Sequence, residues 1–188
     1  MLIVVEGGFG SMTDKDFIEL YCKYLGITPK KICQANGKDN VKSAEAEIHK
    51  ALNMGERVLI IFDADDDIQK SLKNIQTQLV SLNSSWKNQC EIFLMPNNKD
   101  AGNLETLLEN TAKEKCILKC FDNYIECIAK LIDKNSAIRL PNKKAKVFAY
   151  LSSFGFKNGD KNFKLDDSIL DLQSPYLDNL KDFLTIRN

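Results

Sequence analysis

Residues 58–67 read VLIIFDADDD, so five apolar residues are followed by four carboxylates within the next five positions. An uninterrupted apolar run that ends in charged residues is typical of a strand covered on both faces of a parallel sheet. Three further short runs with strand character occupy residues 2–5, 31–34 and 91–95. Together they predict a sheet of about four strands, in which the third strand ends at the carboxylates.

Helical patterns fill the intervals between the predicted strands, at about residues 14–25, 40–54 and 66–82. The first two patterns are followed by Gly26 and Gly55, which suit the left-handed conformation at the end of a helix. Strands that alternate with helices predict an α/β fold with a parallel sheet, flanking helices and right-handed crossovers. Ligands of such sheets gather at the carboxyl ends of the strands.

The remainder of the 188-residue chain is expected to be helical. A long helical pattern lies near residues 112–134, a second helix is expected to begin at Pro141, and residues 176–184 have the spacing of a final helix. A chain of this length fits one domain with a small appendage. We therefore expect an α/β core over residues 1–110 and a helical extension, packed on that core, over residues 111–188.

The composition is that of an ordinary globular protein, with 44% hydrophobic and 28% charged residues. The 26 basic and 26 acidic residues cancel, so any attraction to nucleic acid must come from local patches. No apolar stretch approaches the roughly twenty residues that span a bilayer. The first strand directly follows Met1, without the basic segment of a secretory signal, and we therefore expect a cytoplasmic protein with no membrane partner.

The six cysteines include no C-x-x-C pair and the chain has one histidine, which excludes the usual zinc spacings. Cys116, Cys120 and Cys127 fall on one face of a predicted helix, where free cysteine behaves as a small apolar residue. We expect these three to face the core as the reduced thiols of a reducing compartment.

Asp63 and Asp65 follow a strand that is expected to be buried. Like charges this close repel and raise one another's pKa unless a cation or basic group compensates. Carboxylate oxygens suit Mg²⁺ or Mn²⁺, hard ions that often bridge to phosphate. Asp66 and Asp67 have an alternative role, because acidic residues are favoured in the first turn of a helix. The pattern predicts a metal site at this strand end.

Glu6 ends the first predicted strand, and the following Gly7 and Gly8 permit a tight turn and close approach of the backbone. If the first and third strands are neighbours, Glu6 faces the two aspartates across the edge of the sheet. A dinucleotide-binding loop is the main competing interpretation, since residues 8–13 nearly match G-x-G-x-x-G, but the third glycine is absent. No phosphate-binding P-loop motif occurs.

A glutamate and glycine after the first strand, with Asp-x-Asp after the third, resemble the pattern of the Toprim domain of topoisomerases, primases and related nucleases. The chain is similar to an uncharacterised bacterial Toprim-like group, itself similar to the nuclease domains of overcoming-lysogenization-defect (OLD) proteins. The matching segments are VEG at 5–7, DF at 16–17, GKDN at 37–40, FDAD at 62–65, FLMP at 93–96, GNLE at 102–105 and KAKVFAYL at 144–151. The resemblance covers most of the chain and implies a Toprim-like, Rossmann-like sheet.

The resemblance implies metal-dependent phosphoryl transfer, with hydrolysis of phosphodiester bonds in DNA or RNA as the leading hypothesis. Glu6 would either ligate the metal or act as general base. The implied catalytic residues are Glu6, Asp63, Asp65 and Lys144. The implied ligands of Mg²⁺ or Mn²⁺ are Glu6, Asp63, Asp65, Asp67 and Glu105. The implied substrate-binding positions are Gly7, Gly8 and Lys38. Alternative roles are an ordinary helical glutamate for Glu105 and a solvated lysine for Lys144.

The loop after Glu6 is longer than the compact E-G-x-x-D of many Toprim relatives. Asp14 or Asp16 could therefore supply the next carboxylate, or either could simply begin a helix. A second hypothesis is a binding module that holds Mg²⁺ and a nucleotide without turnover, or that serves as a subunit with a protein partner. A phosphoacceptor receiver domain ranks last, because it needs an acidic pair after the first strand. The sequence leaves the oligomeric state open.

Overall fold

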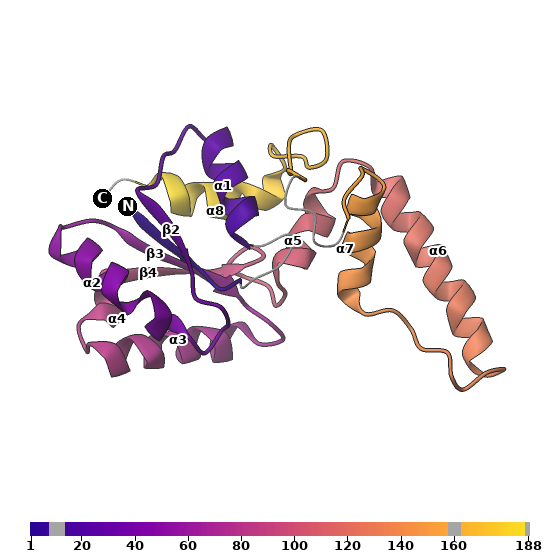
Figure 1. Ribbon diagram of the computed structural model, residues 1–188, viewed down its shortest axis with the longest axis horizontal. Coiled ribbons are helices and arrows are strands. Elements are labelled where there is room, and N and C mark those ends of the chain that lie inside the picture. Colours follow the sequence, from indigo (N-terminus) through magenta and orange to yellow (C-terminus); the bar gives the residue numbers. More distant parts are fainter. Residues whose placement is uncertain (8–13, 158–162, 187–188) are drawn as a thin grey trace.

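Four parallel strands form one sheet in the computed structural model, which describes residues 1–7, 14–157 and 163–186 (Figure 1). The strands are β1 (Leu2–Val5), β2 (Lys31–Gln34), β3 (Val58–Asp63) and β4 (Cys90–Met95). Their order in the sheet is β2-β1-β3-β4, and every pair is parallel. The predicted α/β class with a four-stranded parallel sheet is therefore confirmed.

Helices connect the strands and follow the last of them. The first group is α1 (Asp14–Tyr24), the 3₁₀ helix η1 (Val41–Ala44), α2 (Glu45–Asn53), α3 (Ile68–Leu82) and α4 (Trp86–Gln89). The second group, after β4, is α5 (Leu104–Thr111), α6 (Lys115–Ile132), α7 (Lys143–Ser152), the 3₁₀ helix η2 (Pro175–Leu177) and α8 (Asp178–Thr185). None of the described helices is both long and apolar enough to cross a bilayer.

Each face of the sheet has its own apolar core. Alternate strand side chains such as Ile3 and Leu59 pack with α1, α5, α7 and α8 on one face. Their neighbours Val4 and Ile60 pack with α2, α3 and α4 on the other. Because both faces are covered, the central strands β1 and β3 are apolar at nearly every position, which is the pattern that predicted them.

Several helix ends follow local sequence rules. Gly26 and Gly55, just beyond α1 and α2, have φ angles of 70° and 66°, the left-handed conformation expected of glycine at a helix end. Asp67, Asn103 and Asn142 precede α3, α5 and α7, and the side chain of each accepts a hydrogen bond from a backbone N–H of the first turn. These caps fix where each helix begins.

The helices after residue 111 share the first core with the sheet, through buried residues such as Leu118, Tyr150 and Leu180. Helices α6 and α7 extend away from the end of the sheet at which α5 lies (Figure 1). Leu118 is the one residue of α6 that is buried. Most of α6 is therefore exposed to solvent along its length.

The expectation that the three cysteines of α6 face the core is wrong. Cys116, Cys120 and Cys127 are exposed free thiols, whereas Cys22 and Cys90 are buried. The spacing placed the three on one helix face correctly, but α7 packs against a different part of α6. Which face of an amphipathic helix is covered depends on the position of its neighbour, and this is a tertiary property.

Candidate active site

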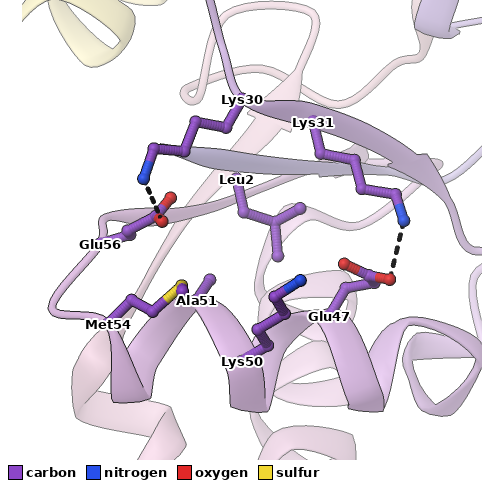
Figure 2. Close-up of a pocket in the computed structure, with 8 residues that line it drawn as sticks. All are labelled: Leu2, Lys30, Lys31, Glu47, Lys50, Ala51, Met54 and Glu56. Atoms are coloured by element: carbon purple, nitrogen blue, oxygen red, sulfur yellow. Dashed lines mark hydrogen bonds and ion pairs between the residues drawn. The ribbon is translucent and has the colours of Figure 1, made fainter.

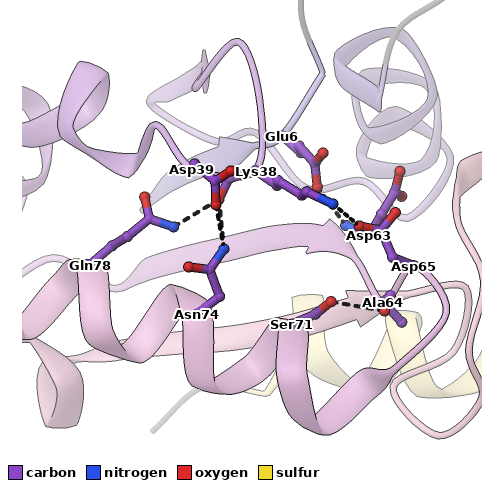
Figure 3. A network of polar contacts seen from close by, with 9 residues as sticks. All are labelled: Glu6, Lys38, Asp39, Asp63, Ala64, Asp65, Ser71, Asn74 and Gln78. Carbon is purple, nitrogen blue, oxygen red and sulfur yellow. Dashed lines mark hydrogen bonds and ion pairs between the residues drawn. The ribbon is translucent and has the colours of Figure 1, made fainter.

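The parallel pairing of β1 with β3 brings the first two carboxylates together. Val5 is in register with Ile61, so Glu6 lies beside the end of β3. Glu6 Oε2 accepts a hydrogen bond from the backbone N–H of Asp63 at 3.1 Å. Figure 3 shows Glu6, Asp63 and Asp65 gathered at this edge. The predicted neighbourhood of Glu6 and the aspartates is therefore present in the structure.

Asp14 contributes a third carboxylate at this edge. Its side chain is buried at the start of α1, and Oδ2 accepts a hydrogen bond from the backbone N–H of Gly7 at 2.5 Å. A Cβ atom on Gly7 would lie 2.7 Å from the same oxygen, so glycine is needed for this approach. Asp16 is exposed on α1. Of the two aspartates that the sequence left open, Asp14 is the one at the carboxylate cluster.

Asp63 lies at the centre of the cluster. Its Oδ1 accepts a hydrogen bond from the backbone N–H of Leu104, the first residue of α5, at 3.1 Å. Burial raises the pKa of Asp63 to about 9, and the charges of Asp14, Glu6 and Glu105 add to this shift. A carboxylate in such surroundings is costly to ionise unless a positive charge is brought to it.

The pKa values of Glu6 and Asp14 are raised for the same reasons. Burial raises the pKa of Glu6 to about 7, while the hydrogen bond from the Asp63 N–H partly opposes the shift. Burial raises the pKa of Asp14 to about 6, against the hydrogen bond from the Gly7 N–H, and the charge of Glu105 raises it further. Mutual repulsion among partly buried carboxylates is the electrostatic condition that a divalent cation relieves.

Two lysines form ion pairs with two further carboxylates near the cluster. Lys38 Nζ lies 2.9 Å from Asp65 Oδ2, and the two residues are 27 positions apart (Figure 3). Lys144 Nζ, from α7, lies 3.2 Å from Glu105 Oε1. The charge of Glu105 raises the pKa of Lys144, with smaller effects from Asp63 and Asp14. Both lysines, predicted as substrate-binding or catalytic, therefore neighbour the cluster.

The turn after β3 is fixed by its surroundings. Asp65 has a φ of 52°, uncommon for a residue with a side chain, and its carbonyl accepts a hydrogen bond from the Gly102 N–H at 2.7 Å. The carbonyl of Ala64 accepts one from the Ser71 hydroxyl at 2.8 Å (Figure 3). Lys38 is anchored as well, because its carbonyl accepts a hydrogen bond from Gln78 Nε2 at 2.8 Å. Hydrogen bonds to the backbone therefore hold both Asp65 and Lys38 in place.

Asp67 caps α3, because its Oδ1 accepts hydrogen bonds from the backbone N–H groups of Gln69 and Lys70. This position at the start of the helix is close to the alternative role, that of an acidic residue in the first turn. Asp66 and Asp67 are exposed and line an open groove of about 650 Å³ along α3. We therefore leave Asp67 out of the proposed ligands. Gly8, predicted to bind substrate, lies outside the described residues.

The carboxylates do not form a preformed metal cage. Within residues 1–7, 14–157 and 163–186, no group of three or more histidine, cysteine, aspartate or glutamate side chains is arranged to hold a metal ion. The donors are all carboxylate oxygens, the set that suits a hard cation such as Mg²⁺ or Mn²⁺. The donor chemistry therefore fits such an ion, but Asp65 and Glu105 are paired with lysines and would have to turn toward it.

A second cluster of charges lies at the other end of β1 (Figure 2). Lys30 Nζ is 2.6 Å from Glu56 Oε1, and Lys31 Nζ is 2.7 Å from Glu47 Oε1, around a pocket of about 270 Å³. The amino group of Met1 is 3.1 Å from Glu56 Oε2. Because these charges are paired with one another, the cluster fastens β1, β2 and α2 together, and we assign it no ligand.

Comparisons with known proteins place the chain in one family. Residues 1–186 match the family described as "Protein of unknown function (DUF3226)". No curated protein and no solved structure matches the chain. The match covers the sheet, the carboxylate cluster and the α6–α7 helices together.

Proposed function

Because the chain belongs to the DUF3226 family, whose function is unknown, we propose its function from the site and from the order of its motifs: hydrolysis of phosphodiester bonds in nucleic acid, dependent on Mg²⁺ or Mn²⁺. The observation that carries the proposal is the convergence of Glu6, Asp14 and Asp63 where the strands end, in surroundings that raise the pKa of all three. The Toprim-like order of motifs supports the same activity. We also propose a cytoplasmic location, in which the exposed thiols of α6 stay reduced.

The proposed ligands are the carboxylates already at the edge. Asp63 and Asp65 would hold the ion, and Glu105 and Asp14 would complete the oxygen set. A bound divalent ion lowers the pKa of water and stabilises negative charge on a phosphate. Mg²⁺ keeps several waters of its own, so a few protein oxygens suffice.

The chain's own residues supply the remaining functions. Glu6, which lies beside Asp63, is placed to accept a proton from the attacking water. Lys38 and Lys144, once their carboxylates turn to a cation, are free to contact the oxygens of a phosphate. Gly7, which has no side chain, permits the close approach of Asp14. In this proposal, the base Glu6, the lysines Lys38 and Lys144 and the metal-binding carboxylates all act at one edge of the sheet.

The test is a cleavage assay on supercoiled plasmid, single-stranded DNA and RNA, each with Mg²⁺, Mn²⁺ or EDTA. The wild-type protein should cleave at least one substrate with metal and none with EDTA. Asp63→Asn should lose about a hundredfold or more of this activity, because the cation that would stabilise the negative charge of the transition state loses a ligand. Asp66→Asn, an exposed residue of the same turn, is the matched control and should stay active. Normal cleavage by Asp63→Asn, or cleavage in EDTA, contradicts the proposal.

A binding module is the second candidate, and the lysine pairs are the observation that favours it. Asp65 and Glu105 are already neutralised, and the described carboxylates form no ready cage. In this case the site holds metal and a nucleotide without turnover, in a protein that works with a partner. Calorimetric titration with Mg²⁺ distinguishes the two, because binding without cleavage of any substrate identifies the module.

A further inference from the structure

Positive charge is concentrated in one part of the chain. Residues 115–157, which contain α6 and α7 and which we call the arm, hold nine lysines and arginines but only three acidic side chains. The rest of the chain holds seventeen basic and twenty-three acidic residues. The net charge of zero therefore conceals a basic arm joined to an acidic α/β core.

The base of the arm is tied to the candidate active site. Lys144 pairs with Glu105 at 3.2 Å, and Lys146 pairs with Glu109 at 3.3 Å and Asp122 at 2.8 Å. Glu105 and Glu109 both belong to α5, whose first N–H bonds to Asp63. These contacts orient α7, and with it α6, relative to the carboxylate cluster.

Four other basic residues of the arm have no carboxylate partner in the part of the chain that the structure describes. Lys119, Lys130, Lys134 and Arg139 are all exposed, and each belongs to α6 or to the segment that joins it to α7. The guanidinium of Arg139 bonds to the carbonyl of Ile138 at 2.9 Å and to that of Ser136. Their positive charges are therefore available to a ligand.

Two of these residues share the polar face of α6. Lys119 and Lys130 are eleven positions apart, about three turns, and so lie within about 20° of one another around the helix. Asp122 is on the same side, but its charge is neutralised by Lys146. Glu126 lies between the two lysines and lowers the net positive charge of this face by one. Helix α7 packs against α6, and half-buried residues of α6 such as Ile125 lie on a different side of the helix from the two lysines. The polar face is the one left open.

The spacing fits a long polyanion. The 18 residues of α6 span about 27 Å at the helical rise per residue. A nucleic acid duplex advances about 3.4 Å per base pair, so this length matches about eight base pairs of regularly spaced phosphates. A mononucleotide is much shorter than α6 and could not contact basic residues along the whole helix.

We propose that the arm binds the sugar-phosphate backbone of a nucleic acid whose reactive phosphate lies at the Glu6–Asp63 edge. The inference rests on the proposed function and adds that the substrate is a polymer that extends along α6. Contacts to phosphates carry no base information, so this binding is independent of sequence. The positive charges of the arm also offset the repulsion between the acidic core and the polyanion.

Binding is measured in EDTA, where cleavage is absent, by fluorescence anisotropy of labelled duplex and single strands of about 30 nucleotides between about 50 and 200 mM salt. The arm variant replaces Lys119, Lys130, Lys134 and Arg139 by Gln. If two of the four side chains contact phosphates at once, the affinity at about 100 mM salt falls about fiftyfold and the salt slope falls by about two. Wild-type affinity for the arm variant overturns the proposal.

Two control variants test whether the loss of binding depends on the position of the charges in the arm, and not only on the net charge of the protein. Circular dichroism tests whether the variants fold. A matched variant replaces four exposed lysines of α1, α2, α4 and α8 by Gln, namely Lys23, Lys50, Lys87 and Lys181. This variant should bind nucleic acid as the wild type does. Glu126→Gln removes the negative charge from the arm and should strengthen binding about fivefold. Equal losses in both lysine variants, or weaker binding by Glu126→Gln, contradict the proposal.

Two further outcomes are informative. Binding of the arm to vesicles that contain phosphatidylserine, without binding to either nucleic acid, assigns the arm to membranes and overturns the inference. Metal-dependent hydrolysis of the small diester bis(4-nitrophenyl) phosphate tests the proposed function alone, because this substrate cannot reach the arm. Hydrolysis of the small diester with no nucleic acid binding in EDTA refutes the inference and leaves the proposed function standing.

Discussion

Replacement of Asp63 by Asn should stabilise the metal-free protein at neutral pH. Asp63 is partly buried among Asp14, Glu6 and Glu105, and its pKa is raised to about 9, first by burial and then by these charges. Asparagine has nearly the same shape, and its oxygen can accept the same hydrogen bond from the Leu104 N–H. The substitution therefore removes the charge and keeps the contact.

The sign follows from proton linkage. An unfolded aspartate has a pKa of about 3.9, so between about pH 4 and 9 the folded protein binds a proton that the unfolded chain has lost. The free energy of unfolding then falls by about 1.4 kcal/mol per pH unit, or about 4 kcal/mol from pH 4 to 7 for an isolated group. Asp63 is only partly buried, and its contact with water reduces this to about 2 kcal/mol, which is the expected gain for Asp63→Asn at pH 7.

The assay is thermal unfolding in EDTA at about pH 5, 7 and 8.5. For a chain of this size a gain of about 2 kcal/mol raises the melting temperature by about 4 to 8 °C, and the difference between variant and wild type should widen as the pH rises. Asp66→Asn, which changes an exposed aspartate of the same turn, should shift the melting temperature little at any pH. A variant that is less stable than the wild type, or whose advantage does not grow with pH, refutes this account of the cluster.

Two further predictions concern the same edge. Addition of Mg²⁺ at about a hundred times its dissociation constant should stabilise the wild-type protein by about 2.7 kcal/mol and Asp63→Asn far less, as measured by thermal unfolding. An equal gain in both proteins would show that the ion binds elsewhere. Gly7→Ala should displace Asp14, since the new Cβ would lie 2.7 Å from its Oδ2; we expect a loss of about 1 kcal/mol in stability and reduced metal-dependent cleavage. Unchanged unfolding and activity in this variant would mean that Asp14 can move without consequence.

The approach of Glu6 to Asp63 could be anticipated because both positions follow apolar runs, and parallel strands present their carboxyl ends at one edge. The prediction needed β1 and β3 to be neighbours, which the order β2-β1-β3-β4 provides. The choice between Asp14 and Asp16 had no such local basis. Because the loop after Glu6 is long, the sequence did not show which aspartate lies beside Gly7. The position of α1 places Asp14 there, where it accepts the hydrogen bond from the Gly7 N–H.

The prediction for the cysteines of α6 was wrong for a related reason. The spacing of Cys116, Cys120 and Cys127 correctly assigned them to one helix face, but spacing contains no information about which face meets α7. The structure leaves that face exposed. For Asp67, by contrast, local sequence is informative. An aspartate just before a helical pattern is a common helix start, and Asp67 caps α3 in the structure.

The strands, most helices and the acidic ends of β1 and β3 were predictable from the amino-acid order, because these features depend on hydrophobic period and on nearby residues that start or stop an element. The charge pairs of the site were not predictable in this way. Lys38 reaches Asp65 across 27 residues, and Lys144 reaches Glu105 from a helix that follows the whole of α6. Such pairs depend on strand order and helix placement, which arise from the packing of the complete chain and leave no periodic pattern near either residue.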